Sequence, residues 1–142
     1  MSLPFPVRIL TMGGPVFDGE ALSLTVPMDR GPMFIERGYT NFMGTLSKAG
    51  VLKLVTKEKT NFYAVFGGIV DVRKGGTTTV YCEEINPGYS IDLARAIAAR
   101  DRNLDRIAKH EDGIDILRAK AKLAKALVRI SVKELSEGAK KD

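Results

Sequence analysis

The first 89 residues alternate between short apolar runs and turn signals, and this pattern predicts a strand-rich domain. The runs are rich in Val, Ile, Leu, Thr and aromatic residues, which favour strands: VRILTM, ALSLTV, VLKLVT, NFYAVF, GIVDV and TTTVYC. Clusters of Gly and Pro between the runs predict turns at GGP, DRGP, RKGG and NPG. Because no helical pattern separates these strands, we expect residues 1–89 to form an antiparallel β-sandwich or a small barrel.

Three pairs of adjacent glycines interrupt this half of the chain. Gly75–Gly76 follows an Arg-Lys pair and predicts a hairpin turn. Gly67–Gly68 lies inside a strand signal, so it predicts a bulge or the close approach of another backbone. Neither of these pairs nor Gly13–Gly14 is followed by the Lys-Ser/Thr of a phosphate-binding loop, so none predicts a nucleotide site of that kind.

Residues 90–142 follow a different pattern, which predicts helices. Residues 91–135 contain one Gly and no Pro, and Ala, Leu, Ile, Lys and Arg dominate them. We expect the first helix to start at a Ser90 cap and to carry Asp92 in its first turn, where a negative charge suits the helix dipole. It should end near the HEDG stretch, because Gly113 allows the chain to bend there.

The second helix is predicted from about Ile114 to Leu135. Its apolar residues recur at helical spacing, as Ile116, Leu123 and Ile130 with Ala119, Ala126 and Leu127 between them. The first helix offers Ile97, Leu104 and Ile107 on one side. A connection this short makes the helices antiparallel neighbours, and the fold class is therefore α+β, strands first and a two-helix hairpin second. Alanines bury little area, so we expect a marginally stable, mobile hairpin with a frayed polar end, SEGAKKD.

Composition excludes several functional classes. The chain is 44% hydrophobic and 27% charged, which is typical of a globular domain. No window approaches the roughly 18 apolar residues of a membrane helix, and the N-terminus lacks the apolar core of a signal peptide, so neither secretion nor membrane insertion is expected. A single Cys82, expected to be buried, excludes an internal disulfide. A metal site is not expected, since His110, beside Glu111 and Asp112, fits a solvated loop better.

The positive charge is concentrated on the second helix. The chain has a net charge of +5, and between Leu117 and Leu135 only Glu134 opposes a group of six cations: Arg118, Lys120, Lys122, Lys125, Arg129 and Lys133. Such a helix is either a solvated face or a surface for an acidic partner. One alternative is a nucleic-acid-binding module, although no groove-reading motif is present. A small enzyme is a further alternative, but no spacing suggests a catalytic pair.

The stretch SIDLARAIAARDR places three charged residues on one side of the first helix. Asp92, Arg95 and Arg102 are three and seven residues apart, so they share a face. The two arginines could hold phosphates as bidentate donors. The simpler interpretation is a surface pair between Asp92 and Arg95, and spacing alone favours that pair.

The order of these parts, together with several strings, resembles the epsilon subunit of bacterial F-type ATP synthases. TMGGPVFDGEALSLTV looks like that family's first hairpin, and NFYAVFGGIVDVRKGGTTTVY is similar to its Gly-Gly strand. IDLARA matches the family's nucleotide-binding pattern, and LAKALVRISVKEL resembles its terminal helix. The match is weakest over residues 30–43, where Pro32, Phe34 and Tyr39 replace the family's Glu, Gly and His.

The resemblance implies a non-catalytic rotor subunit at the cytoplasmic face of the inner membrane, with no required cofactor. A ten-stranded sandwich, residues 1–89, would bind the gamma subunit, and the turn Asp29, Arg30, Gly31 and Pro32 would touch the c-subunit ring. The hairpin, residues 90–142, would extend into the catalytic head and block ATP hydrolysis. Its contact with acidic segments of the alpha and beta subunits would involve Lys120, Lys122, Lys125, Arg129 and Lys133. No nucleic-acid partner is implied.

The same resemblance implies that ATP binds the folded hairpin and regulates it. The matching positions are Ile91, Asp92, Arg95, Ala96, Arg102, Lys125 and Arg129. Lys125 stands where binding members have arginine, so the charge remains but the planar fork is lost. Asn86 stands where they have glutamate, so a carboxylate acceptor is lost. We therefore expect weaker ATP binding than in the best binders.

Overall fold

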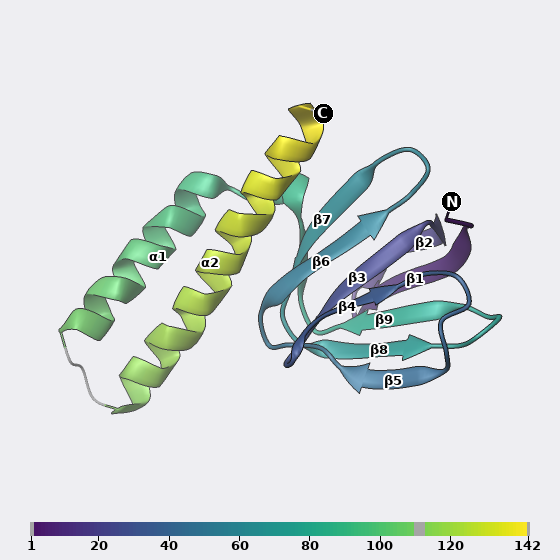
Figure 1. Cartoon of the computed structure of the whole chain (residues 1–142). Helices are drawn as coiled ribbons and strands as arrows, with labels where there is room; N and C mark the ends of the chain where they lie inside the picture. The colour runs from purple at the N-terminus through teal and green to yellow at the C-terminus, as the bar shows by residue number, and fades with distance from the viewer. Residues whose placement is uncertain (1, 110–112, 142) are drawn as a thin grey trace.

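The computed structural model describes residues 2–109 and 113–141, which form a β-sandwich followed by two helices (Figure 1). The strands are β1 (Phe5–Thr11), β2 (Gly14–Ala21), β3 (Ser23–Met28), β4 (Gly31–Ile35), β5 (Phe42–Thr45), β6 (Gly50–Val55), β7 (Thr60–Val65), β8 (Gly68–Val72), β9 (Thr78–Cys82) and β10 (Ile85–Pro87). A short 3₁₀ turn, Gly88–Ser90, leads to α1 (Leu93–Ala108), and α2 (Gly113–Lys141) follows.

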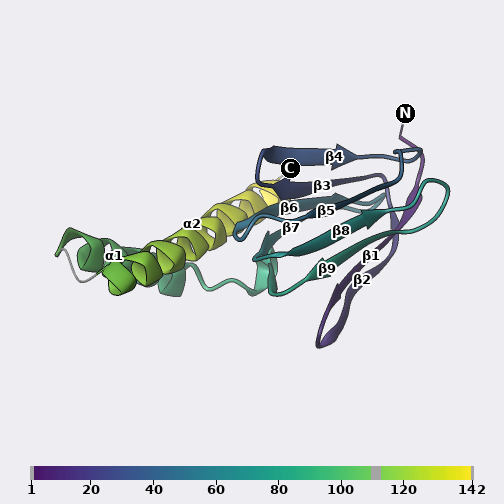
Figure 2. The ribbon, with the colours of Figure 1, turned by 90° about the horizontal axis from the view of Figure 1, so that it is seen from below.

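The strands form two five-stranded sheets, one with the order β2-β1-β9-β8-β5 and the other β10-β7-β6-β3-β4. Figure 2 shows them from below as two layers, with β4 and β3 on one side and β1 and β2 on the other. The predicted α+β class and the antiparallel sandwich are confirmed, except that β1 and β9 pair in parallel. Such a pair needs a long crossover, which the seven strands between β1 and β9 supply.

Four strands, β2, β4, β5 and β10, lie outside the six predicted from apolar runs. Their sequences are GPVFDGEA, GPMFI, FMGT and INP, in which Gly, Pro and polar residues obscure the strand pattern. The predicted turn at NPG is wrong, because Asn86 and Pro87 belong to β10. Since β10 is an edge strand, a proline there removes no essential ladder hydrogen bond.

The close backbone approach predicted at Gly67–Gly68 is confirmed. Both residues have positive φ, +81° and +138°. A Cβ atom on Gly68 would collide with the carbonyl oxygen of Tyr81 and lie 3.0 Å from Cα of Cys82. Only glycine fits a position that is strained and crowded at once. This allows β8 to leave the end of β7 and pair with β9 in the opposite sheet.

The sandwich core consists of side chains that point inward from both sheets. The largest fully buried ones on the strands are Ile9, Leu24, Ile35, Leu52, Leu54, Val7, Val26, Val65, Val70 and Val80. From Phe5 to Ile9 in β1, buried and exposed side chains alternate, because successive side chains of a strand face opposite sides of the sheet. The sandwich therefore has a core of its own, to which the helices contribute nothing.

The helices lie side by side, and α2 runs between α1 and the sandwich (Figure 1). The predicted end of the second helix at Leu135 is wrong, because α2 continues to Lys141. The fraying expected for the SEGAKKD end stays a prediction. An ion pair between Lys133 and Glu137, 3.2 Å long and one turn apart, supports this extension. Gly88 also accommodates Ser136 so closely that a Cβ atom on Gly88 would lie 2.8 Å from Cβ of Ser136.

The helices contact each other through small residues spaced seven apart. Ala96 and Asn103 on α1 are buried, as are Ala119 and Ala126 on α2. Burial was correctly predicted for both α2 alanines. It was wrong for Leu104 and Leu127, which are 47% and 46% exposed, because the small residues rather than the leucines occupy the buried face. The other apolar residues predicted for these stripes are half-buried: Ile97, Ile107, Ile116, Leu123 and Ile130.

A second, smaller core joins α2 to the outer face of the sheet that contains β6 and β7. Val132 of α2 and Ile91, which precedes α1, pack there with Ala64 and Phe66. Val128 is among the partly buried residues at its edge. Few side chains take part, so the apolar contribution to docking is small compared with that of the sandwich core.

Asn103 is a polar defect between the helices, which yields the first prediction. Its side-chain nitrogen donates to the carbonyl oxygen of Ala99 at 2.7 Å, but Oδ1 is buried and has no hydrogen-bond partner among the described residues. Replacing Asn103 by Ala should stabilise the hairpin by about 1 kcal/mol, because it removes an unsatisfied buried acceptor. The measurement is hydrogen exchange of α1 amides in the full chain.

The control for Asn103→Ala is Asp101→Ala, which brings a similar gain in helix propensity at an exposed position of α1. It also removes an exposed ion pair with Arg100, which contributes little to stability. Slower exchange in Asn103→Ala than in Asp101→Ala is expected. Equal or faster exchange would contradict a destabilising role of the buried carboxamide.

Candidate functional site

The IDLARA motif lies where the chain passes from the 3₁₀ turn into α1, and three of its residues serve the fold. Ile91 is 7% exposed in the second core, and Ala96 is buried between the helices. Asp92, not Ser90 as predicted, caps α1, because its carboxylate accepts from the backbone N–H of Arg95 at 3.1 Å. Ser90 belongs to the 3₁₀ turn, where its hydroxyl donates to the carbonyl oxygen of Pro87.

Arg95 and Arg102 are both exposed on α1. The contact between Asp92 and Arg95 is a helix cap formed by the backbone, rather than the side-chain ion pair that the spacing favoured. Within residues 2–109 and 113–141, no ion pair is formed by either arginine. Two guanidinium groups seven residues apart are thus available to an anion.

Lys125 and Arg129, one turn apart on α2, both bind Glu84 of the sandwich. Nζ of Lys125 lies 3.1 Å from Oε1 of Glu84, and Nη2 of Arg129 lies 2.8 Å from Oε2. Arg129 also donates from Nε to Oδ1 of Asn86 at 2.9 Å. The three charged side chains are 29–43% exposed, so water screens these contacts only in part.

An aromatic ring lies against the same two cations. Lys125 Nζ and Arg129 Cζ are 5.1 Å and 4.7 Å from the centroid of Phe66, within the range of cation–π contacts. Phe66 is 4% exposed, and its backbone N–H donates to the carbonyl oxygen of Glu84. This bond holds together the backbones from which the carboxylate and the ring project. We call Glu84, Phe66, Lys125 and Arg129 the Glu84 cluster.

The predicted nucleotide residues therefore fall into two groups. Lys125 and Arg129 are brought together, but around a carboxylate of the chain itself, while Arg95 and Arg102 remain exposed on the other helix. Sequence analysis missed Glu84 and Phe66. The only signal was a Glu-Glu pair before β10, and nothing in the sequence joins it to cations 41 and 45 residues later.

The five cations predicted to meet acidic partners also differ in their surroundings. Lys120 and Lys122 are exposed, whereas Lys125 and Arg129 belong to the Glu84 cluster. Lys133 pairs with Glu137. In this folded arrangement, the first two are thus the more accessible to a partner.

The turn predicted to touch the rotor ring joins β3 to β4. Asp29, Arg30 and Pro32 are exposed, and Gly31 has φ +121°. The side chain of Phe34, one of the residues that depart from the family's pattern, is 55% exposed. The turn thus presents two opposite charges, with an exposed aromatic ring nearby in β4.

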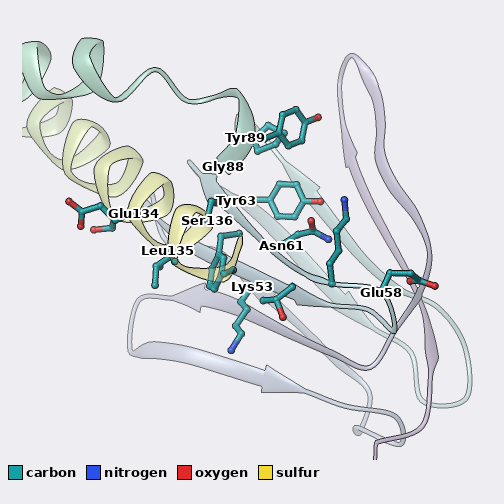
Figure 3. Close-up of a pocket in the computed structure, with 16 residues that line it drawn as sticks. Lys53, Glu58, Asn61, Tyr63, Gly88, Tyr89, Glu134, Leu135 and Ser136 are labelled. Atoms are coloured by element: carbon teal, nitrogen blue, oxygen red, sulfur yellow. The ribbon is translucent and has the colours of Figure 1, made fainter. Parts of the chain in front are cut away.

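A groove of about 1140 Å³ lies between β6, β7 and the last turns of α2 (Figure 3). Its lining includes Tyr63, Tyr89, Glu134 and Leu135, and none of the predicted site residues. Burial, with a smaller effect of Tyr89, raises the pKa of Tyr63 above its usual range. The groove holds both charge signs and an exposed Tyr89, so its lining does not select one class of ligand.

Several further expectations concern reactive groups and membrane contact. Cys82 is buried as predicted, and burial raises the pKa of its thiol to about 11. His110, Glu111 and Asp112 lie outside the described residues. Within the described ranges, no three His, Cys, Asp or Glu side chains gather as they would around a metal ion. None of the helices in those ranges is long and apolar enough to cross a membrane.

Comparison with known families agrees with this two-part structure. Residues 4–88 match the family described as the β-sandwich domain of the ATP synthase delta/epsilon chain, and residues 90–134 match its long α-helix domain. The chain belongs to the ATP synthase delta/epsilon chain family, so the resemblance to ATP synthase epsilon subunits found in the sequence is confirmed.

The similarity to known relatives and to solved structures extends over most of the chain. ATP synthase epsilon chains from Bacillus velezensis and Desulforapulum autotrophicum are 34% and 35% identical, covering 89% and 90% of this chain and 94% of each relative. A chain in the Euglena gracilis mitochondrial ATP synthase structure (OSCP/F1/c-ring) has a TM-score of 0.76 at 17% identity, covering 92% of this chain and 79% of that one. This second likeness supports the fold alone.

Proposed function

We propose that this chain is the epsilon subunit of the central stalk of an F-type ATP synthase, a rotor subunit without catalytic activity of its own. The observation that carries the proposal is the match of both parts, sandwich and hairpin, to one family in the right order. The complex would couple proton flow to ATP synthesis at the cytoplasmic face of the inner membrane. The chain would be a peripheral component there.

The sandwich is proposed to bind the gamma subunit and the c-subunit ring. On the outer face of one sheet, Tyr81 lies opposite both Leu10 and Ile69 in neighbouring strands. Tyr81 and Ile69 are 49% and 45% exposed, so this row offers apolar area to a partner. The exposed turn from Asp29 to Pro32 is a separate surface and is assigned to the ring.

The hairpin is proposed to inhibit ATP hydrolysis when it leaves the sandwich and extends into the catalytic head. Its small interface with the sandwich supports such a movement, because few apolar contacts would be lost. Lys120 and Lys122 would meet acidic segments of the alpha and beta subunits first. Lys125 and Arg129 would join them after separating from Glu84.

Replacing cations of α2 tests the inhibitory contact. The joint change of Lys120, Lys122, Lys125 and Arg129 to Ala removes up to four screened charge pairs with the head, each contributing up to about 1 kcal/mol. Loss of the two ion pairs with Glu84 eases undocking and offsets part of this effect, so inhibition of hydrolysis should weaken by roughly tenfold. The double variant Lys120→Ala/Lys122→Ala should show part of this loss with the Glu84 cluster intact. The measurement is the concentration of added chain that halves ATP hydrolysis by the catalytic head.

The control for these variants is the sandwich variant in which four exposed lysines become Ala: Lys48, Lys57, Lys59 and Lys74. It removes the same charge and should inhibit like the wild type, and inhibition by the wild type should weaken as salt rises. Unchanged inhibition by both α2 variants would exclude an electrostatic contact.

The folded hairpin is also proposed to bind ATP. Arg95 and Arg102 would hold phosphates together with Lys125 and Arg129, while Ile91, Asp92 and Ala96 would shape the adjoining surface. The exposure of the two α1 arginines supports this assignment. Because Asp92 already caps α1, it would contribute to ATP binding by fixing the position of the start of this helix.

Titration of ATP into the full chain tests the nucleotide site. We expect saturable one-to-one binding, weakened roughly tenfold or more by Arg95→Ala, because a charge-assisted guanidinium–phosphate contact contributes about 1.5–3 kcal/mol. Arg100→Ala is the control, since Arg100 pairs with Asp101 at 2.9 Å and lies outside the motif. Absence of binding at millimolar ATP would mean that Arg95 and Arg102 do not form a nucleotide site and belong to a solvated helix face.

A further inference from the structure

The Glu84 cluster bridges the two parts of the molecule. Glu84 lies between β9 and β10 and so belongs to the sandwich, whereas Lys125 and Arg129 belong to α2. The two ion pairs therefore form only when α2 is docked. Among the residues that the structure describes, no other ion pair joins the sandwich to a helix.

The geometry of Glu84 is that of a bound anion. Each carboxylate oxygen meets a different cation, Oε1 with Lys125 and Oε2 with Arg129. Two donors of Arg129 are in use, because Nε donates to Asn86 and Nη2 to Glu84. A phosphate group that approached these cations would need the same donors.

A negative charge at this place favours docking. Lys125 and Arg129 are one turn apart and lie close to the same ring of Phe66, so they repel each other. The side chains of Lys125 and Arg129 are 41% and 29% exposed, so they are partly shielded from water, and an adjacent negative charge offsets their repulsion and partial desolvation. Glu84 supplies the negative charge from within the chain.

We propose that Glu84 is a built-in substitute for a phosphate ligand, which holds the hairpin on the sandwich without nucleotide. Only the identification of that ligand as ATP rests on the proposed function; the ion pairs do not. A polyphosphate that binds Lys125 and Arg129 has to displace Glu84. The wild-type hairpin is therefore docked with or without polyphosphate, and loss of the Glu84 charge makes docking depend on added anion.

The test measures the distance between the sandwich and α2 in the full chain. Spin labels are placed at two exposed positions, Lys57→Cys at the turn before β7 and Ala121→Cys on α2. Native Cys82 is buried and does not compete for the label. The distance distribution is recorded without ligand, with inorganic tripolyphosphate and with ATP, for the wild type, Glu84→Gln and Glu83→Gln. Glu83 is the matched control, because it is an exposed carboxylate one residue earlier.

The wild type and Glu83→Gln should show one short distance that tripolyphosphate does not change. In Glu84→Gln the undocked population should be at least about fivefold larger than in the wild type, as expected for the loss of a modest interaction. Adding tripolyphosphate to this variant should restore the short distance. Indistinguishable distributions for Glu84→Gln and Glu83→Gln would overturn the proposal. Undocking that tripolyphosphate fails to reverse would overturn the role of Glu84 as a phosphate substitute.

The same samples also test the nucleotide part of the proposed function, independently of the role of Glu84. If tripolyphosphate restores docking in Glu84→Gln but ATP does not, the inference stands and the ATP site fails. A charge-reversed variant, Glu84→Lys with Lys125→Glu and Arg129→Glu, should recover the short distance without ligand. Thermal unfolding of each variant checks that the sandwich is intact, and failure of the reversed variant with a folded sandwich would count against the ion pairs as the cause.

Discussion

The docking of α2 on the outer face of β6 and β7 is the contact on which the rest of the molecule's behaviour depends. Its apolar part is a small cluster around Val132 and Phe66, and its polar part is the Glu84 cluster. The sandwich does not need this contact, because its own core lies between its two sheets. The proposed separation of the hairpin would therefore leave the sandwich folded, as a two-state regulatory element requires.

This docked arrangement explains how a helix with so much positive charge, α2, can lie on the sandwich. A helix with six cations against one acidic residue between Leu117 and Leu135 is costly to place on another surface unless part of the charge is compensated. Glu84 compensates Lys125 and Arg129 in the docked state, while Lys120 and Lys122 stay exposed. In the proposed extended state, undocking would release two more cations toward an acidic partner, so the same residues would serve both states.

Much of the fold could be predicted because it is encoded locally. Apolar runs revealed six strands, the Gly67–Gly68 pair revealed a close backbone approach, and the absence of Pro after residue 90 revealed two helices. The strands that were missed contain Gly and Pro at edges and turns, where the strand pattern is weak. The cap was assigned to Ser90 because both Ser90 and Asp92 are good caps, and only the 3₁₀ turn decides between them.

The candidate site was predicted less completely, for a physical reason. Helical spacing places Lys125 and Arg129 on one face, but it does not say what faces them. Glu84 and Phe66 reach them through the pairing of β10 with β7 and the docking of α2, which are long-range contacts. Likewise, periodicity favoured Leu104 for the helix interface, whereas close packing of alanines buried Asn103 beside it.

The central claim, a hairpin that separates from an independently stable sandwich, is tested most directly by native-state hydrogen exchange of the full chain in rising denaturant. The account predicts that amides of α1 and α2 exchange through an opening whose free energy lies clearly below that of β1, β6 and β9. Marginal helices without a docking surface do not protect their amides. Exchange of helices and strands through a single global unfolding, with one common free energy, would contradict the account.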